Sequence, residues 1–451
     1  MTRVLIPSGA LGLNYDKAAL ARGIAAKPDI IAIDGGSTDS GPSYLGRGVS
    51  KYARASTKIE WAGLMDARAI ADCPLVIGTS GTCGADNAVD WMLDITCEIA
   101  AEQGRPLKVA VLRSGQSGDR MAEAFDDGKI TPLPNAPEVT AATFRECANI
   151  VALAGAEQIL AALATGADIV IAGRTTDTAI IAALPLAQGC HAGGAWHGAK
   201  IGECGALCAT RPQSGVILVD FDQEGFTVTP LADGSHATPH TVSAHMLYEN
   251  SDPFILYEPG GHLDVRRATY TALDDTSVRV TGSEWITSDT YTVKLEGARP
   301  VGFQCALMAL LRDPHYVANA SNWAKDITAK CSGKVVDRIG LSKEEFRIEL
   351  RLIGQDASFG GLETAAGSAH EIGVIGIITA PTAAQAEEIG KLLNPYLLHH
   401  PLTQEEEQPT FAFLFSPPEM MLGQKYEFAL NHVLTLDDPM KVFRLEVIDI
   451  G

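Results

Sequence analysis

Polar residues that could carry acid–base chemistry follow an apolar run near the start of the chain. The segment DGGSTD occupies residues 34–39, directly after the apolar run 30–33. Asp34 and Asp39 could act as acid and base or bind a divalent cation, and the glycines and hydroxyls between them suit close contact with an anionic oxygen. The contacts we expect there are Gly35, Gly36, Ser37 and Thr38. A polar loop that merely caps the next helix is the alternative.

A second loop of this kind, GTSGTCG over residues 78–84, lies between an apolar run and a helical pattern. Backbone N–H groups at the start of that helix would form a site for phosphate or carboxylate. The contacts we expect are Ser80, Gly81, Thr82 and Cys83, with Arg113 at the end of the next apolar run. The glycine spacing does not fit a dinucleotide-binding loop. Thr82 replaces the last glycine of a G-x-S-x-G elbow, which weakens Ser80 as a nucleophile, and Cys83 is either a reactive thiol or a packing residue.

A third polar segment contains an arginine that could hold an anion. Arg174 and Thr175 follow the apolar run 168–172, and Asp177 stands two positions further on. An arginine next to hydroxyl residues at a helix start suits bidentate binding of a substrate carboxylate. The alternative is a helix cap with Arg174 in a structural ion pair.

Residues 189–208 contain several metal-ligand residue types and one further acid–base candidate. The cysteines and histidine that could bind zinc are Cys190, His191, Cys204 and Cys208. Their spacing matches no standard structural zinc pattern, so we expect no zinc there. Glu203 is instead expected to act as acid or base. Other cofactors stay unknown, and a divalent cation at Asp34 and Asp39 stays open.

The segment YEPGGHLDVRR, residues 257–267, offers a histidine beside carboxylates. His262 could remove a proton next to a carbonyl, because histidine titrates near neutral pH. Glu258 would contact the substrate. A surface turn with a solvated histidine is the alternative. The segment 359–371 also contains a histidine beside a carboxylate, and the same alternative applies to it.

The pattern of apolar runs predicts where these side chains lie. Up to about residue 215, short apolar runs alternate with helical patterns, which predicts an α/β domain with a mainly parallel sheet over residues 1–215. Closely spaced alternating segments then predict an α+β domain over residues 216–451. Loops after parallel strands meet at one edge of a sheet. We therefore expect one cleft between the two domains, with the turn around His262 closing over it.

Composition narrows the classes of partner. The chain has 35 basic and 55 acidic residues and a formal charge of -20, which disfavours nucleic acid as a ligand. The first residues hold too short an apolar run for a secretory signal, and no run is long enough for a membrane span. The nine cysteines, an odd number, are expected to be reduced thiols. We expect a cytoplasmic protein that contacts neither nucleic acid nor membrane.

Several segments, taken in order, carry a family resemblance. They are IAIDGGSTDSGP, IGTSGTCGADNAVDWMLDI, IVIAGRTTDTA, WHGAKIGECGAL, LYEPGGHLDV and LNHVLTLDDP. Together they resemble the acyclic terpene utilisation (AtuA-type) family over nearly the whole chain. The resemblance implies a role in branched acyl-CoA hydration, but it assigns no catalytic residue. Longer relatives carry an extra small C-terminal domain, so the resemblance leaves room for a separate small partner subunit.

These observations favour a small-acid or acyl-CoA lyase of the hydratase or dehydratase type, acting next to a carboxylate or thioester carbonyl. Two alternatives stay open. One is a hydrolase or amidase with Cys83 or Ser80 as nucleophile, and the other is a ligand-binding subunit without catalysis. We expect the chain to form a homo-oligomer.

Overall fold

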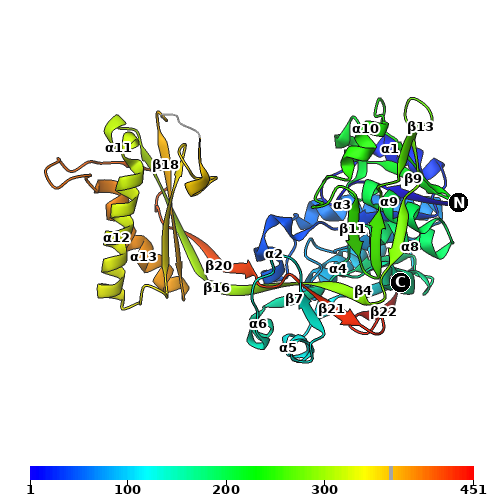
Figure 1. Ribbon diagram of the computed structural model, residues 1–451, viewed down its shortest axis with the longest axis horizontal. Helices are drawn as coiled ribbons and strands as arrows, with labels where there is room; N and C mark the ends of the chain where they lie inside the picture. Colours follow the sequence, from blue (N-terminus) through cyan, green and yellow to red (C-terminus); the bar gives the residue numbers. More distant parts are fainter. Residues whose placement is uncertain (365–368) are drawn as a thin grey trace. The chain divides into compact units, whose positions relative to one another are not determined.

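The computed structural model describes residues 1–364 and 369–451, so part of the 359–371 segment lies outside the described residues. The chain forms two compact units. Unit 1 consists of Met1–Arg299 and Phe428–Gly451, and unit 2 consists of Pro300–Glu427. Figure 1 labels several elements of each unit.

A ten-stranded sheet forms the centre of unit 1, in the order β13-β14-β10-β9-β1-β2-β3-β8-β4-β22. Its parallel part consists of β1 (Thr2–Ile6), β2 (Ile30–Asp34), β3 (Leu75–Gly78), β8 (Ile169–Ala172) and β4 (Leu107–Arg113). The antiparallel strands are β9 (Ile217–Phe221), β10 (Gly225–Pro230), β14 (Val278–Thr281), β13 (Thr269–Ala272) and β22 (Arg444–Ile450). The predicted α/β class is confirmed.

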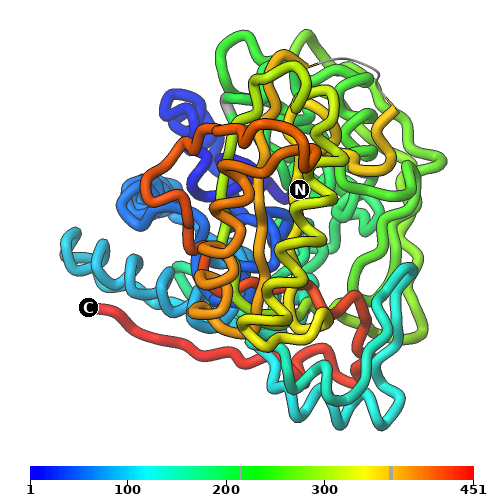
Figure 2. Tube along the Cα trace, turned by 90° about the vertical axis from the view of Figure 1, so that its left-hand side faces the viewer, coloured from blue at the N-terminus to red at the C-terminus, as the bar shows by residue number. Residues whose placement is uncertain are grey.

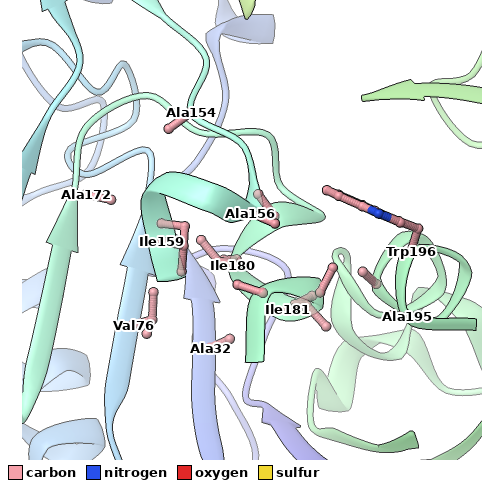
Figure 3. Packing of buried hydrophobic residues seen from close by; sticks show 14 of the residues in the cluster. Ala32, Val76, Ala154, Ala156, Ile159, Ala172, Ile180, Ile181, Ala195 and Trp196 are labelled. Carbon is pink, nitrogen blue, oxygen red and sulfur yellow. The ribbon is translucent and has the colours of Figure 1, made fainter. Parts of the chain in front are cut away.

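Helices cover both faces of the parallel strands, because alternate residues of each strand point to opposite faces. Ala32, Val76 and Ala172 pack against Ile159 and Ile180 on one face, and Figure 3 shows this packing. The helices on this face are α7 (Ala156–Leu163), α8 (Ala179–Ala187) and α9 (Ala192–Gly202). The helices on the other face are α1 (Lys17–Ala25), α3 (Arg54–Ala71) and α4 (Asp86–Gln103). Burial on both faces explains why these strands are continuous apolar runs.

One predicted strand lies outside this sheet. The apolar run 149–155 is one of the alternating runs that predict parallel strands before residue 215, but β7 (Asn149–Ala152) pairs antiparallel with β16 (Tyr291–Leu311) and with β5 (Gly115–Gln116). The outer edge of β4 is taken by β22, the red C-terminal strand of Figure 2. The edge that β7 would have needed is therefore occupied.

The observed units also divide at a place other than residue 215. Strand β9 pairs with β1, and β10 pairs with β9. The antiparallel segment after residue 215 therefore extends the parallel sheet, and unit 2 begins within β16. The change from alternating helices and strands to adjacent strands marks the edge of one sheet rather than a new unit.

Smaller elements complete unit 1. They are η1 (Thr38–Ser40), α2 (Pro42–Arg47), α5 (Gly118–Asp126), β6 (Ile130–Pro132), α6 (Ala141–Glu146), η2 (Gly205–Cys208), η3 (Pro212–Ser214), α10 (Pro239–His245), β11 (Ile255–Glu258), β12 (Gly261–Asp264), β15 (Glu284–Thr287) and β21 (His432–Leu436). Strands β11, β12 and β15 form a separate three-stranded sheet.

Unit 2 is an antiparallel sheet with helices packed on it. Its strands are the second half of β16 with β18 (Ile372–Ala380), β17 (Arg347–Ile353), β19 (Ala412–Phe413) and β20 (Met420–Phe428). Its helical elements are α11 (Pro314–Ala318), α12 (Ala320–Ile339), η4 (Gly360–Leu362) and α13 (Ala383–His399). Trp323, Ile327 and Leu393 are buried in its core. No helix in the described part of the chain has the length and apolar character needed to cross a membrane.

Candidate functional site

A pocket of about 270 Å³ lies in unit 1 at the carboxyl ends of β1, β2 and β8. Ser8 and Gly9 follow β1, Asp34 ends β2, and Asp177 follows β8. Glu203, Cys204 and Tyr248 also line the pocket. Parallel strands place their following loops at one edge, which brings Asp34 and Asp177 to this pocket, and Glu203, which follows α9, lines it as well.

Asp34 is the most deeply buried carboxylate from the segment after β2. Its side chain is 6% exposed, and Oδ2 accepts a hydrogen bond from the Gly36 N–H at 3.0 Å. Its Oδ1 has no hydrogen-bond partner among the described residues. Burial, and then the nearby Asp177 charge, raise the pKa of Asp34 well above its ordinary value. Asp34 therefore holds its proton at a higher pH than an exposed aspartate does.

Arg174 binds side chains of the protein itself. Its guanidinium donates to the two oxygens of Glu296 at 3.0 and 3.2 Å, and Nη1 donates to Thr79 at 3.2 Å. Burial alone would raise the pKa of Glu296, but the charge of Arg174 lowers it overall. Nη1 also lies 3.7 Å from Asp177 Oδ1. Arg174 thus forms the structural ion pair that was the alternative to binding a substrate carboxylate.

Glu203 forms a buried ion pair with a lysine next to the pocket. The Lys200 ammonium pairs with Glu203 Oε1 and donates to the Tyr248 carbonyl at 2.9 Å. Burial raises the pKa of Glu203 to about 8, although Lys200 opposes that shift. Burial and the Glu203 charge raise the pKa of the Cys204 thiol, and burial lowers the pKa of His245 to about 4.

The loop after β2 contributes only some of its predicted contacts. Gly36, Ser37 and Asp39 line the pocket. The hydroxyl of Thr38 donates to Glu296 at 3.2 Å, and a Cβ on Gly35 would lie 2.5 Å from the Thr79 carbonyl oxygen. Asp39 lies 3.5 Å from Lys51, and its pKa is lowered by hydrogen bonding to Ser37 and by the Lys51 charge.

The loop after β3 does not line the pocket. Ser80 is fully buried, with no hydrogen-bond partner for its hydroxyl among the described residues. Cys83 is packed with Leu45 and Val151, and burial raises the pKa of its thiol. Gly81 contacts Ala88 in α4, and the Thr82 hydroxyl accepts a hydrogen bond from the Lys51 N–H at 3.1 Å. None of these four predicted contacts faces this pocket, because the loop packs between its neighbours.

Four other predicted site residues also lie outside the pocket. Arg113 donates to Asp90 at 2.7 Å. Thr175 is fully buried beside Thr79. His262 lies in β12, where its ring is 5.5 Å from that of Tyr257. Glu258 accepts a hydrogen bond from Thr178, and burial raises its pKa to about 7. Glu258 lies close enough to Glu203 to affect its pKa.

The residues considered for zinc make separate contacts. Cys190 contacts Thr2 and the Phe221 carbonyl, whereas Cys208 donates to the Gly205 carbonyl. The His191 ring accepts a hydrogen bond from the Gly194 N–H at the start of α9. The one group of three metal-ligand side chains that converges among the described residues is Glu203, Cys204 and His245. That group includes neither Asp34 nor Asp39.

Sequence reasoning missed several residues of the site. Lys51, Lys200 and Tyr248 line or border the pocket, and Glu296 holds Arg174. The position of Lys200 in the last turn of α9, three positions before the C-cap residue Glu203, was a usable signal, since residues at i and i+3 are neighbours. No sequence signal pointed to Glu296, because it comes from a strand far along the chain.

Comparison with known proteins gives one result. A family model described as acyclic terpene utilisation family protein AtuA matches residues 81–410 of the 451. No curated protein and no solved structure matches the chain significantly. The matched range contains Asp177, Glu203 and Cys204, and Asp34 precedes it. Because the match extends over more than two thirds of the sequence, the chain belongs to the acyclic terpene utilisation (AtuA) family.

Proposed function

We propose that the chain is a lyase that adds or removes water next to the carboxylate or thioester carbonyl of a small acid. The observation that carries this proposal is the pair Asp34 and Asp177: both residues line one pocket, and the charge of Asp177 raises the pKa of Asp34. Elimination of water needs a proton donor for the leaving hydroxyl and a base for the carbon next to the carbonyl. Two interacting carboxyl groups can share one proton and so fill both roles.

Asp34 is the proton donor in this proposal, and Asp177 is the base. The raised pKa of Asp34 favours its protonated form, and its Oδ1 has no protein partner in the described chain. Burial also raises the pKa of Asp177, but the charge of Arg174 opposes that shift. The carboxyl group nearer the arginine is the one that ionises more readily.

The size and charges of the pocket support a small anionic substrate. A cavity of about 270 Å³ lies at the small end of ligand pockets, which favours a short acid or the acyl end of a thioester. Lys51 lines this pocket, and its ammonium group donates to Ser40 at 2.9 Å and lies 3.5 Å from Asp39. Because 20% of its side chain is exposed and the ion pair with Asp39 is long, a substrate carboxylate can compete for this ammonium group. Lys51 replaces Arg174 as the proposed anion contact.

The proposal extends to the setting of the reaction. All nine cysteines are free thiols, which supports a reducing compartment such as the cytoplasm. The substrate in this proposal is a free acid or its coenzyme A thioester. The chain acts as a homo-oligomer, with room for a separate small subunit, and it binds neither nucleic acid nor membrane.

Deuterium incorporation tests the proposed proton abstraction. The protein is incubated in D₂O with short 3-hydroxy acids and their coenzyme A thioesters, and exchange of the hydrogen next to the carbonyl is followed by proton NMR. The wild-type chain should exchange that hydrogen in at least one compound. Asp34→Asn should slow water addition and elimination, and Asp177→Asn should slow the exchange itself, each by roughly 100-fold or more.

The matched control is Asp94→Asn, which removes an exposed carboxylate in α4 outside the pocket. It should leave exchange and turnover unchanged. Binding of an acid without exchange or turnover would favour a ligand-binding subunit. Hydrolysis that survives both pocket variants would favour the hydrolase alternative.

A further inference from the structure

Three side chains from two helix ends converge beside the pocket. One oxygen of Glu203, the sulfur of Cys204 and one ring nitrogen of His245 lie within 4.8 Å of one another. Glu203 and Cys204 follow α9, and His245 is the last residue of α10. Carboxylate oxygen, thiolate sulfur and imidazole nitrogen are the ligands that zinc accepts in proteins. We propose that Glu203, Cys204 and His245 bind a Zn²⁺ ion, and we name them the triad.

His245 supplies a second, independent observation. Its side chain is 5% exposed, and its Nε2 atom is buried with no hydrogen-bond partner among the described residues. Buried polar atoms normally have a partner. The ring is also stacked on Tyr248, with centroids 5.4 Å apart and planes 9° from parallel. The imidazole is therefore held in place by stacking, and one of its ring nitrogens has no hydrogen-bond partner among the described residues. Both properties are expected of a histidine that binds a metal ion.

Lys200 is compatible with an ion in the triad. Its ammonium bonds one oxygen of Glu203, Oε1, and a carboxylate has a second oxygen. Lys200 also donates to the Tyr248 carbonyl, so it keeps a partner if Glu203 moves toward the ion. Binding requires the Cys204 thiolate and the Glu203 carboxylate, and any proton that either group holds is released to solvent.

The position of the triad suggests a reactive rather than a structural ion. Glu203 and Cys204 line the pocket, so a fourth coordination position would open toward the substrate space. Three protein ligands with one open position are typical of catalytic zinc sites. The inference stands apart from the reaction proposed above, because metal binding requires only the three side chains.

The triad differs from the zinc pattern weighed in the sequence. The two sets share only Cys204, and His245 lies on another helix well beyond residues 189–208. Local spacing could not reveal a ligand that the fold brings in from a distance.

Cobalt substitution tests the triad directly. The full chain is treated with EDTA, desalted and titrated with Co²⁺, whose thiolate complexes absorb in the near ultraviolet. The wild-type chain should bind one Co²⁺ with a sulfur-to-cobalt band, and one Zn²⁺ should displace it. Cys204→Ala should abolish the band. His245→Ala and Glu203→Gln should each weaken binding by more than the roughly 10- to 100-fold that loss of an outer-shell partner costs.

Two controls separate loss of a ligand from general damage. Cys208→Ala removes a buried thiol four positions from Cys204, and His240→Ala removes an exposed histidine of α10. Both should keep the band and the affinity, and circular dichroism checks that every variant is folded. Failure of the wild-type chain to bind Co²⁺ or Zn²⁺, or a band that persists in folded Cys204→Ala, would overturn the proposal.

Discussion

The loops after β2 and β3 have similar compositions but different surroundings. Both are rich in glycine and hydroxyl residues. The loop after β2 contributes Asp34, Gly36 and Ser37 to the pocket. The loop after β3 is enclosed, since a Cβ on Gly84 would lie 2.1 Å from the Arg174 N atom and Gly35 packs against Thr79. Glycine next to a strand end thus allows close approach of either a ligand or another backbone.

The backbone of the two loops shows the same contrast. Thr79 and Thr82 have φ values of 44° and 78°, a region that β-branched residues rarely adopt. Such strain persists only where the surroundings enforce it. The loop after β3 is therefore a packing element that holds the edge of the sheet, and the loop after β2 is the one with groups free for chemistry.

Removing the ion pair that connects both loops should have the largest effect. Glu296 accepts from Thr38 in one loop, and Arg174 donates to Thr79 in the other. Arg174→Ala would leave Glu296 buried without its partner, so we expect a loss of about 3 to 5 kcal/mol in the free energy of unfolding by urea. A variant of wild-type stability that fails only in substrate binding would instead support the substrate-carboxylate role.

The double variant Arg174→Met with Glu296→Leu is the control for this prediction. It removes both charges and keeps apolar volume, so it should recover much of the lost stability. No recovery would mean that the hydrogen bonds to Thr38 and Thr79 matter more than the ion pair.

Adding a methyl group to the enclosed loop should have the next largest effect. In Gly84→Ala the residue keeps a φ of 64°, and its added Cβ would lie only 2.1 Å from the Arg174 N atom. We therefore expect a loss of about 2 to 4 kcal/mol in the free energy of unfolding. Gly104→Ala is the matched control, because its φ is 60° but no atom lies within 4 Å of the added Cβ. Its cost should be about 1 to 2 kcal/mol. Equal losses in the two variants would show that the loop after β3 is not tightly enclosed.

The pocket loop should differ from the enclosed loop in its response to pH. The pKa of folded Asp34 is raised above the ordinary 3.8, so the stability of the wild-type chain should fall as pH rises from that value through the folded pKa. Asp34→Asn stays neutral and should show a flatter dependence. Urea unfolding at pH 5 and pH 8 measures this dependence. The free energy of unfolding of Asp34→Asn, relative to that of the wild-type chain, should rise from pH 5 to pH 8. Asp94→Asn should keep the pH dependence of the wild-type chain. An equally flattened dependence in Asp94→Asn would contradict the assignment to Asp34.

The smallest effect is expected for a hydroxyl of the enclosed loop. Ser80→Ala removes a buried oxygen that has no partner in the described structure, so stability should stay within about 1 kcal/mol of wild type. Turnover should be unchanged. Loss of activity with retained stability would instead support Ser80 as a nucleophile.

The sequence predicts the parallel strands well because burial on both faces produces continuous apolar runs. Strand β2, for example, is buried at all five positions. The prediction for β7 differs from the structure because a short apolar run carries no information about which strand it pairs with. The same holds for the boundary at residue 215, since pairing between β1 and β9 joins segments far apart in the chain.

The candidate site was predictable only where residues follow parallel strands. Asp34 and Asp177 could be grouped because the topology places their loops at one edge. The position of Arg174 was equally predictable, but its partner was not. Glu296 and His245 come from β16 and α10, and no local pattern connects them with the residues that they approach.

The division of unit 1 into two chain segments has a consequence for synthesis on the ribosome. Strand β4 gains its outer partner β22 only after the 128 residues of unit 2 have been made. At about 5 to 20 residues per second, synthesis of unit 2 alone takes roughly 6 to 26 s, and the outer edge of β4 stays open for at least that time. An open edge of this kind pairs readily with other chains. The nascent protein therefore passes through an interval in which it is prone to aggregate and offers an extended segment to chaperones.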